Sequence, residues 1–280
     1  MSKIKIVTDS TVDLTDEEIS QYNLEVVPLS IHINGDTFID RVDITPVEFI
    51  RKMKESPELP KSSQPAVGKF AEVYDRLADE GYEVISIHMT GGMSGTVQSA
   101  ASATQMTKAK VHVVDSKYIS TALAFQVIEA AKLAQAGKTA EEILAAVEKV
   151  REQTTLFVVV DTLENLIKGG RIGKGQGMIG SLLNIKPIAT LDGGVYTPVA
   201  KVRSHSQVVK YLAKQFVEET KGKTIHGVGI VHVEGLDLAN KLKDAIYELT
   251  GYADVDIRYT TPVIGTHTGV GAIGFMYYCE

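Results

Sequence analysis

Two patterns of hydrophobic residues alternate along the first part of the chain. Short apolar runs that are typical of buried strands occur at 4–11, 26–33, 82–88, 111–114 and 156–160. Between these runs, apolar residues recur at helical spacing, as at Val67, Phe70, Tyr74 and Leu77. Strands that alternate with amphipathic helices predict a mainly parallel sheet with helices on both faces.

Capping signals indicate where several helices begin. Thr45 with Glu48, and Thr139 with Glu142, fit the capping box, in which a threonine and an acidic residue satisfy each other's backbone N–H groups. We therefore expect helices to begin directly after Thr45 and Thr139. The segment Ser56–Pro65 is rich in proline and serine, and it predicts a turn-rich loop between two helices.

The pattern changes after residue 160. Two strand-like runs, 185–191 and 195–202, flank a turn around Gly193, which predicts a β-hairpin. Helical and strand-like segments then alternate to the end of the 280-residue chain, a length that fits two domains. We predict an N-terminal α/β domain, 1–160, and a C-terminal α/β domain, 161–280, that contains the antiparallel hairpin.

Composition restricts the classes of function. Hydrophobic residues make up 44% and charged residues 23%, as in soluble globular proteins, and no apolar run is long enough to cross a bilayer. The net charge of −6, without a sustained basic run, argues against a dedicated nucleic-acid binder. We expect a cytoplasmic protein, because the chain starts with a strand-like run instead of a secretory signal. The single cysteine, Cys279, excludes an internal disulfide, and its apolar surroundings place it in the core.

Four predicted strands of the first domain end in polar residues. These ends are 8–10, 89–94, 115–116 and 161–162. Ligands of parallel α/β sheets bind beyond the carboxyl ends of the strands, so a site is expected at this edge. The seven histidines show none of the paired spacings of a zinc site, and we expect neither a metal nor a cofactor.

The glycine-rich turn after the strand 82–88 is the most unusual of these ends. Its glycines allow positive φ and a close approach to a ligand, and the N–H groups of the helix that follows suit an oxyanion. Ser94 and Thr96 add hydroxyls beside Gly95. Ser94 either binds an anion or caps the helix.

Two further polar loops contain groups that could complete a site. Lys61–Pro65 precedes a helix, and Gly265–Gly271 is glycine-rich and carries His267 between two threonines. His267 is either a ligand-binding residue or an ordinary surface residue.

A glycine-rich stretch, 168–180, carries Arg171 and could bind an anion. It lacks the spacing of a phosphate-binding loop, because Lys174 is followed by Gly175 where serine or threonine is required. A nucleotide site is therefore disfavoured here.

A serine hydrolase is one interpretation of the polar residues. Ser94, Asp115 and His267 occur in the chain order of an α/β-hydrolase triad. The nucleophile elbow of such enzymes requires Gly-x-Ser-x-Gly, however, and Thr96 replaces the second glycine. Asp115 could instead cap the next helix.

Seven motifs taken together resemble one known family. They are TDST near the start, SSQP, GGMSGTVQSA, VVDS, LIKGGRI, the KPI of the hairpin and GTHTGVGAIG. In this order, and over the whole chain, they resemble the DegV family. The resemblance implies a two-domain protein that binds one long-chain fatty acid, such as palmitate, without itself being the catalyst.

Members of this family are similar to the FakB subunit of bacterial fatty acid kinase. That subunit offers the fatty acid carboxylate to a separate ATP-binding subunit, which forms the acyl phosphate. The partners implied are thus a fatty acid, a kinase subunit and, transiently, a membrane. A lipid carrier without a kinase partner stays open as an alternative.

The resemblance also assigns roles to residues. Ser62 and Ser94 correspond to the family's hydrogen-bond donors to the carboxylate; relatives often carry threonine at the position of Ser62. His267 corresponds to a residue that orients the head group, and Arg171 to one that serves the anion or the kinase. The head-group or partner site implied in this way comprises His267, Arg171, Gly95 and Thr96.

Overall fold

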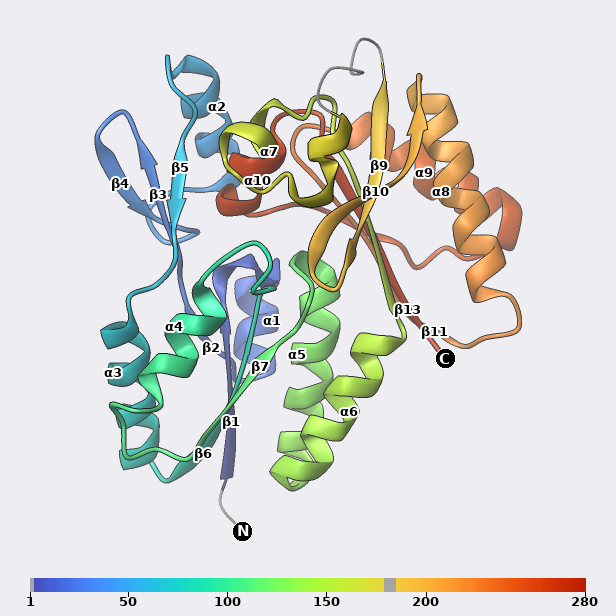
Figure 1. Cartoon of the computed structure of the whole chain (residues 1–280). Coiled ribbons are helices and arrows are strands. Elements are labelled where there is room, and N and C mark those ends of the chain that lie inside the picture. Colours follow the sequence, from blue (N-terminus) through green and yellow to red (C-terminus); the bar gives the residue numbers. More distant parts are fainter. Residues whose placement is uncertain (1–2, 179–184) are drawn as a thin grey trace.

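The computed structural model describes residues 3–178 and 185–280, and Figure 1 shows two main sheets with their helices and a small third sheet. The first main sheet has four parallel strands in the order β2-β1-β6-β7. Their bounds are β1 Lys3–Asp9, β2 Glu25–Val27, β6 Tyr82–His88 and β7 Val111–Asp115. The predicted parallel sheet is therefore confirmed.

Helices cover both faces of the parallel sheet. Neighbouring strand residues point to opposite faces, so Val7 packs with α3 and α4, whereas Ile6 packs with α5. The helices that follow or flank these strands are α1 Asp16–Gln21, α3 Val67–Asp79, α4 Thr96–Ala103, α5 Ser120–Gln135 and α6 Ala140–Glu152. The capping box predicted at Thr139 and Glu142 is present at the start of α6.

The second main sheet has six strands in the order β10-β9-β8-β13-β11-β12, of which only β11 and β12 pair in parallel. Their bounds are β8 Thr154–Val159, β9 Lys186–Asp192, β10 Val195–Val202, β11 Ile225–His232, β12 Asp256–Tyr259 and β13 Ile273–Cys279. The predicted hairpin is β9 and β10, and its turn residues Gly193 and Gly194 both have positive φ. Cys279 is buried, as expected.

Helix α5 lies between the two main sheets. Helices α8, His205–Thr220, and α9, Leu236–Thr250, cover the other face of the six-stranded sheet. A Cβ at Gly227 of β11 would lie 2.7 Å from a ring carbon of Phe125, and one at Gly229 would lie 2.8 Å from Thr121. The two glycines thus allow α5 to pack directly on β11.

The strand predicted at 156–160 belongs to the second sheet and not to the parallel one. β8 pairs with β9 and β13, so Asp161 and Thr162 do not follow a strand of the parallel sheet. The continuous apolar run misled the prediction, because a buried antiparallel strand has the same pattern. Helices α5 and α6 connect the first sheet to the second. The predicted domain boundary at residue 160 stays a prediction.

A third sheet of three strands, in the order β4-β3-β5, stands beside the first. Its strands are β3 Ser30–Ile33, β4 Asp36–Ile39 and β5 Lys61–Ser63, and α2, Pro46–Glu55, begins at the predicted capping box. Two expectations were wrong here. The run 26–33 divides between two sheets at Pro28 and Leu29, and the predicted loop at 56–65 contains β5.

Three short elements surround the centre of the molecule. They are α7 Glu164–Lys168, the 3₁₀ segment η2 Gly173–Met178, and α10 Pro262–Thr268. The predicted loop Gly265–Gly271 therefore begins as helix, because Pro262 occupies the first turn, where proline favours helix formation. Within the described ranges, no helix is both long and apolar enough to span a bilayer.

Candidate functional site

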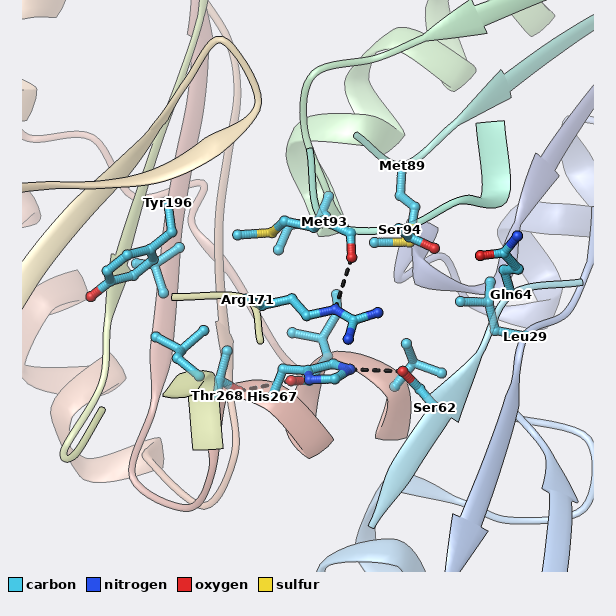
Figure 2. A pocket seen from close by; sticks show the side chains of 15 residues that line it. Leu29, Ser62, Gln64, Met89, Met93, Ser94, Arg171, Tyr196, His267 and Thr268 are labelled. Atoms are coloured by element: carbon cyan, nitrogen blue, oxygen red, sulfur yellow. Dashed lines mark hydrogen bonds between the residues drawn. The ribbon is translucent and has the colours of Figure 1, made fainter. Parts of the chain in front are cut away.

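A cavity lies where β5, the turn before α4, α7 and α10 meet (Figure 2). Its empty volume is about 580 Å³, counted with the open space at its mouth. Five polar side chains gather at one end of it: Ser62, Gln64, Ser94, Arg171 and His267. Four of these were predicted from the sequence, and they come from segments far apart in the chain.

The rest of the cavity wall is mostly apolar, apart from the hydroxyl-bearing side chains of Tyr196 and Thr268. The lining includes Met89, Met93, Ile119, Val158, Leu166 and Ile264. A second cavity of about 330 Å³ shares Ile119, Val158 and Ile264 with the first and continues among apolar residues of β8, β11 and β13. A polar end that leads into adjoining apolar space suits an amphiphile with a long hydrocarbon chain.

Ser62 and His267 meet at the polar end. Ser62 Oγ and His267 Nε2 share a hydrogen bond of 2.7 Å. Burial and, to a lesser extent, the charge of Arg171 together lower the pKa of His267 to about 4, so the imidazole is neutral at pH 7. When Nε2 carries the proton, it donates to Ser62, and the hydroxyl hydrogen of Ser62 is free for a ligand oxygen.

Backbone carbonyls fix the direction of Arg171. Its Nε donates to Met93 O at 2.9 Å, and its Nη1 donates to Gly169 O at 2.5 Å. No carboxylate among residues 3–178 and 185–280 forms an ion pair with it. A guanidinium has five N–H donors, so several remain for an anion at the polar end.

Ser94 does not cap α4. The N-cap residue is Gly95, which has no side chain, and α4 begins at Thr96. Ser94 Oγ lies 2.8 Å from Thr96 Oγ1 and accepts a long hydrogen bond of 3.3 Å from Thr96 N. Capping was therefore the wrong alternative, and the hydroxyl of Ser94 lines the cavity.

The glycines of this turn serve close packing and not positive φ. Gly91, Gly92 and Gly95 all have ordinary φ values. A Cβ at Gly95 would lie 2.2 Å from Gln64 Oε1, and one at Gly92 would lie 2.4 Å from the carbonyl oxygen of Gly194. The predicted positive φ is therefore wrong, whereas the glycines do allow other parts of the chain to pack closely against this turn.

Gln64 is the polar residue that the sequence reasoning missed. Its Nε2 donates to Ser99 Oγ on α4 at 3.0 Å, and its amide oxygen packs against Gly95. The signal was present, because Gln64 belongs to the SSQP motif and stands directly before a proline.

The predicted hydrolase triad is not assembled. Asp115 accepts from Gly91 N at 3.3 Å and forms an ion pair with Lys117 at 2.7 Å. His267 Nδ1, which an acid would have to orient, is buried and has no hydrogen-bond partner among the described residues. The hydrogen bond of His267 goes to Ser62 and not to Ser94, so the three predicted residues do not form a relay.

A different serine, histidine and aspartate do form a chain, in the core. Ser86 Oγ lies 2.7 Å from His88 Nε2, and His88 Nδ1 lies 3.1 Å from Asp9 Oδ2. All three side chains are fully buried, and Ser86 also bonds to Tyr74. Because Ser86 is fully buried, the network serves the packing of β1 against β6.

The glycine-rich stretch 168–180 forms one wall of the site, although its last two residues lie outside the described ranges. Lys168 forms an ion pair with Glu164, and Lys174 forms one with Asp192, so their charges are compensated. Arg171 is the cation of this stretch that faces the cavity. The described ranges contain no group of three histidine, cysteine or acidic residues that could hold a metal ion.

The polar end also faces an open groove. This groove has an empty volume of about 1350 Å³, which includes open solvent, and it shares Ser62, Arg171 and His267 with the apolar cavity. Segment 56–61 forms one side of it, and Lys168 lies on the other. A head group held at the polar end would therefore be reachable from outside, while its chain lies in the interior.

Comparison with known proteins agrees with this architecture. A DegV domain-containing protein of Listeria innocua is 47% identical over 281 residues, which cover 100% of each chain. A DegV family protein from Thermus thermophilus, which binds fatty acid, superposes with a TM-score of 0.92 at 33% identity, and both chains are covered to 100%. DegV of Bacillus subtilis, a fatty acid binding protein, gives 0.91 at 31% identity and the same coverage.

The family model of the DegV proteins matches residues 3–280, almost the whole length of the sequence. Neither this match nor the two structural likenesses is confined to one part of the fold. The chain belongs to the DegV family.

Proposed function

We propose that this protein binds one long-chain fatty acid non-covalently. The carboxylate is held at the polar end by Ser62, Ser94 and Arg171, and the hydrocarbon chain fills the apolar cavities. The main support is that these three side chains lie together at one end of a cavity whose other lining residues are mostly apolar. The fatty acids bound by the relatives from Thermus thermophilus and Bacillus subtilis support it.

The two parts of such a ligand contribute differently. Burial of the chain yields roughly 0.8 kcal/mol per CH₂, hence on the order of 10 kcal/mol for a palmitate-sized tail before association costs are subtracted. Hydrogen bonds from hydroxyl groups contribute about 0.5–1.5 kcal/mol each. The tail therefore supplies most of the affinity, and the polar end fixes where the carboxylate lies.

The position of the carboxylate matters because we also propose that it is presented to a separate kinase subunit. The polar end faces the groove along segment 56–61, so an approaching active site reaches the head group without displacing the tail. Neutral His267 beside Ser62 keeps the hydroxyl hydrogen directed to the ligand during the transfer of the phosphoryl group. In this arrangement, the present chain binds and orients, and the partner supplies ATP and the chemistry.

The test is a set of serine variants. Ser62→Ala and Ser94→Ala each weaken palmitate binding by about two- to tenfold, measured by isothermal titration calorimetry, and reduce acyl phosphate formation with a fatty acid kinase subunit far more. Ser63→Ala is the matched control, because its hydroxyl bonds to His32 and not to the cavity. Equal losses in binding and phosphorylation would contradict the proposal that the tail supplies the affinity and the two serines position the carboxylate.

The second candidate is a lipid carrier without a kinase partner. The same apolar cavity favours it, because storage of a chain requires no access to the head group. A protein that binds palmitate tightly, but whose palmitate no fatty acid kinase subunit phosphorylates, would be a carrier.

A further inference from the structure

The inner end of the apolar space lies against the six-stranded sheet. The second cavity, of about 330 Å³, adjoins the first through Ile119, Val158 and Ile264, and none of the five side chains of the polar end lines it. A fatty acid whose carboxylate lies at the polar end therefore enters the second cavity with its methyl end.

The hydroxyl groups along the second cavity already have partners. Ser120 and Thr260 both donate to the carboxylate of Asp13, the latter at 2.8 Å. Thr268 Oγ1 donates to the carbonyl oxygen of Ile264 at 3.0 Å. These groups do not require a polar ligand, so the cavity suits the hydrocarbon end of a fatty acid.

His232 also borders this cavity, but its ring belongs to the other face of the sheet. In the pairing of β11 with β13 it lies opposite Ile273, which packs with the helices α8 and α9. Its ring packs on that of Tyr259, with 4.3 Å between the ring centroids. Residues that lie opposite each other on paired strands share a face, so the imidazole points away from the cavity.

Gly274 of β13 forms part of the cavity wall. In the sheet it lies between Val158 of β8 and Val231 of β11, which both line the cavity. A side chain at position 274 would share their face and point into the cavity. Gly274 is partly exposed, whereas its neighbours Ile273 and Phe275 are buried on the other face. The free space at the inner end thus depends on the missing side chain.

The side chain of Met276 lies across this position. Met276 is two residues further along β13, lines the same cavity and is fully buried. A Cβ at Gly274 would lie 3.3 Å from Met276 Sδ and 3.0 Å from Val231 Cγ2. Methionine is unbranched and adapts its shape, whereas valine is stiff at χ1. Met276 is therefore the part of this wall that can yield to a ligand.

We propose that Gly274 and Met276 determine the length of the fatty acid chain that this protein binds. The methyl end of the chain lies against Gly274, and the Met276 side chain stops it there. The inference rests on the proposed function, because it concerns the far end of the same bound fatty acid. It makes these two residues determinants of specificity, at the opposite end of the ligand from Ser62 and Ser94.

The size of the effect follows from the burial of methylene groups. Each methylene group that enters apolar surroundings lowers the Kd about fourfold, hence roughly 15-fold for two. This gain continues until the methyl end meets Met276 and stops at longer chains. A methyl group at residue 274 takes up space at the inner end, so Gly274→Ala stops the gain about two carbon atoms earlier. Met276→Ala opens the same end, and the gain then continues to longer chains.

The test is a series of saturated fatty acids from laurate to behenate, which lengthen by two carbon atoms each. Displacement of a fluorescent fatty acid from the full-length protein gives the Kd of each. We expect Gly274→Ala to bind laurate within about twofold of the wild type, but to weaken the longest acid that still gains affinity in the wild type roughly 4- to 15-fold. Gly68→Ala is the matched control, because Gly68 is exposed on α3 and no atom lies within 4 Å of its Cβ position.

Two results would overturn the proposal: a Gly274→Ala variant that weakens short and long acids by the same factor, or a Met276→Ala variant whose gain stops at the wild-type length. Should the variants fail to fold, the wild-type series still decides, because a constant gain from laurate to behenate would show that no stop exists. A wild type that binds none of these acids would instead contradict the proposed function.

Discussion

Replacement of Arg171 by methionine is the most informative perturbation of the site. The variant Arg171→Met removes a half-buried charge but keeps most of the apolar length of the side chain. In the wild type, the carbonyl oxygens of Met93 and Gly169 hold the guanidinium in place, so little side-chain entropy is lost when an anion binds. We therefore expect a large effect on affinity for a single substitution.

The magnitude follows from the contacts. A hydrogen bond to a charged group contributes about 1.5–3 kcal/mol, so Arg171→Met raises the Kd for palmitate roughly 10- to 150-fold. Arg171→Lys recovers only part of this loss, because one ammonium group cannot hold both carbonyls and also bind the ligand. Arg171→Met also raises the pKa of His267, because the charge of Arg171 lowers that pKa in the wild type.

The assay is calorimetric titration with palmitate, together with an NMR titration of the His267 ring. Arg203→Met is the matched control, because Arg203 is exposed and lines neither the cavity nor the groove, and its replacement removes the same charge. If Arg171→Met bound palmitate within twofold of the wild type, the guanidinium would not contact the carboxylate, and the account of the polar end would be refuted.

Two further predictions concern packing and acid stability. Gly95→Ala pushes a methyl group against the end of the flexible, exposed Gln64 side chain, which can turn away, so we expect the free energy of unfolding to change by less than about 1 kcal/mol, whereas displacement of the Gln64 amide weakens palmitate binding. Urea denaturation and calorimetry measure the two quantities, and unchanged palmitate binding would show that Gln64 does not act at the polar end. Burial raises the pKa of Asp9, but hydrogen bonds from His88, Thr11 and Met89 lower it more, to below its ordinary value. The stability that Asp9 contributes is therefore complete above about pH 4 and is lost as the pH falls through the folded pKa. Asp9→Asn costs about 3–5 kcal/mol at pH 7, and urea denaturation should find a smaller difference from wild type at pH 3; a difference that does not shrink would contradict the assignment.

Much of the fold could be predicted because local signals agree with it. The strand at 82–88, the capping boxes at Thr45 and Thr139, and the hairpin around Gly193 lie where the sequence indicates them. The capping boxes and the hairpin depend on hydrogen bonds between residues close in the chain, whereas the strand is indicated by its own apolar run, although its partners β1 and β7 lie far along the chain. Sheet membership does not: β8 looks like a parallel strand, and only its partners β9 and β13 assign it to the second sheet.

The sequence predicted most residues of the site but not the contacts between them. Ser62, Ser94, Arg171 and His267 do line one cavity, but the bond between Ser62 and His267 joins residues 205 positions apart. No local pattern encodes such a contact. The chain order of Ser94, Asp115 and His267 is compatible with a catalytic triad. Order along the chain says nothing about distance in the fold, however, so it could not show that the three residues do not meet.

The contact between Asp13 and the start of α10 was likewise beyond the reach of local patterns. Asp13 stands two residues after the TDST motif, and the residues around it indicate no partner at the other end of the chain. Only the folded chain brings its carboxylate to Thr261. Buried carboxylates of this kind become recognisable once their partners are known.

Native mass spectrometry of the purified protein, followed by extraction under denaturing conditions and identification of the released molecule, shows whether this chain binds a fatty acid. We expect one long-chain fatty acid per chain, depleted in a Ser62→Ala/Ser94→Ala double variant. A protein that is empty and takes up neither palmitate nor oleate would contradict fatty acid binding by this chain.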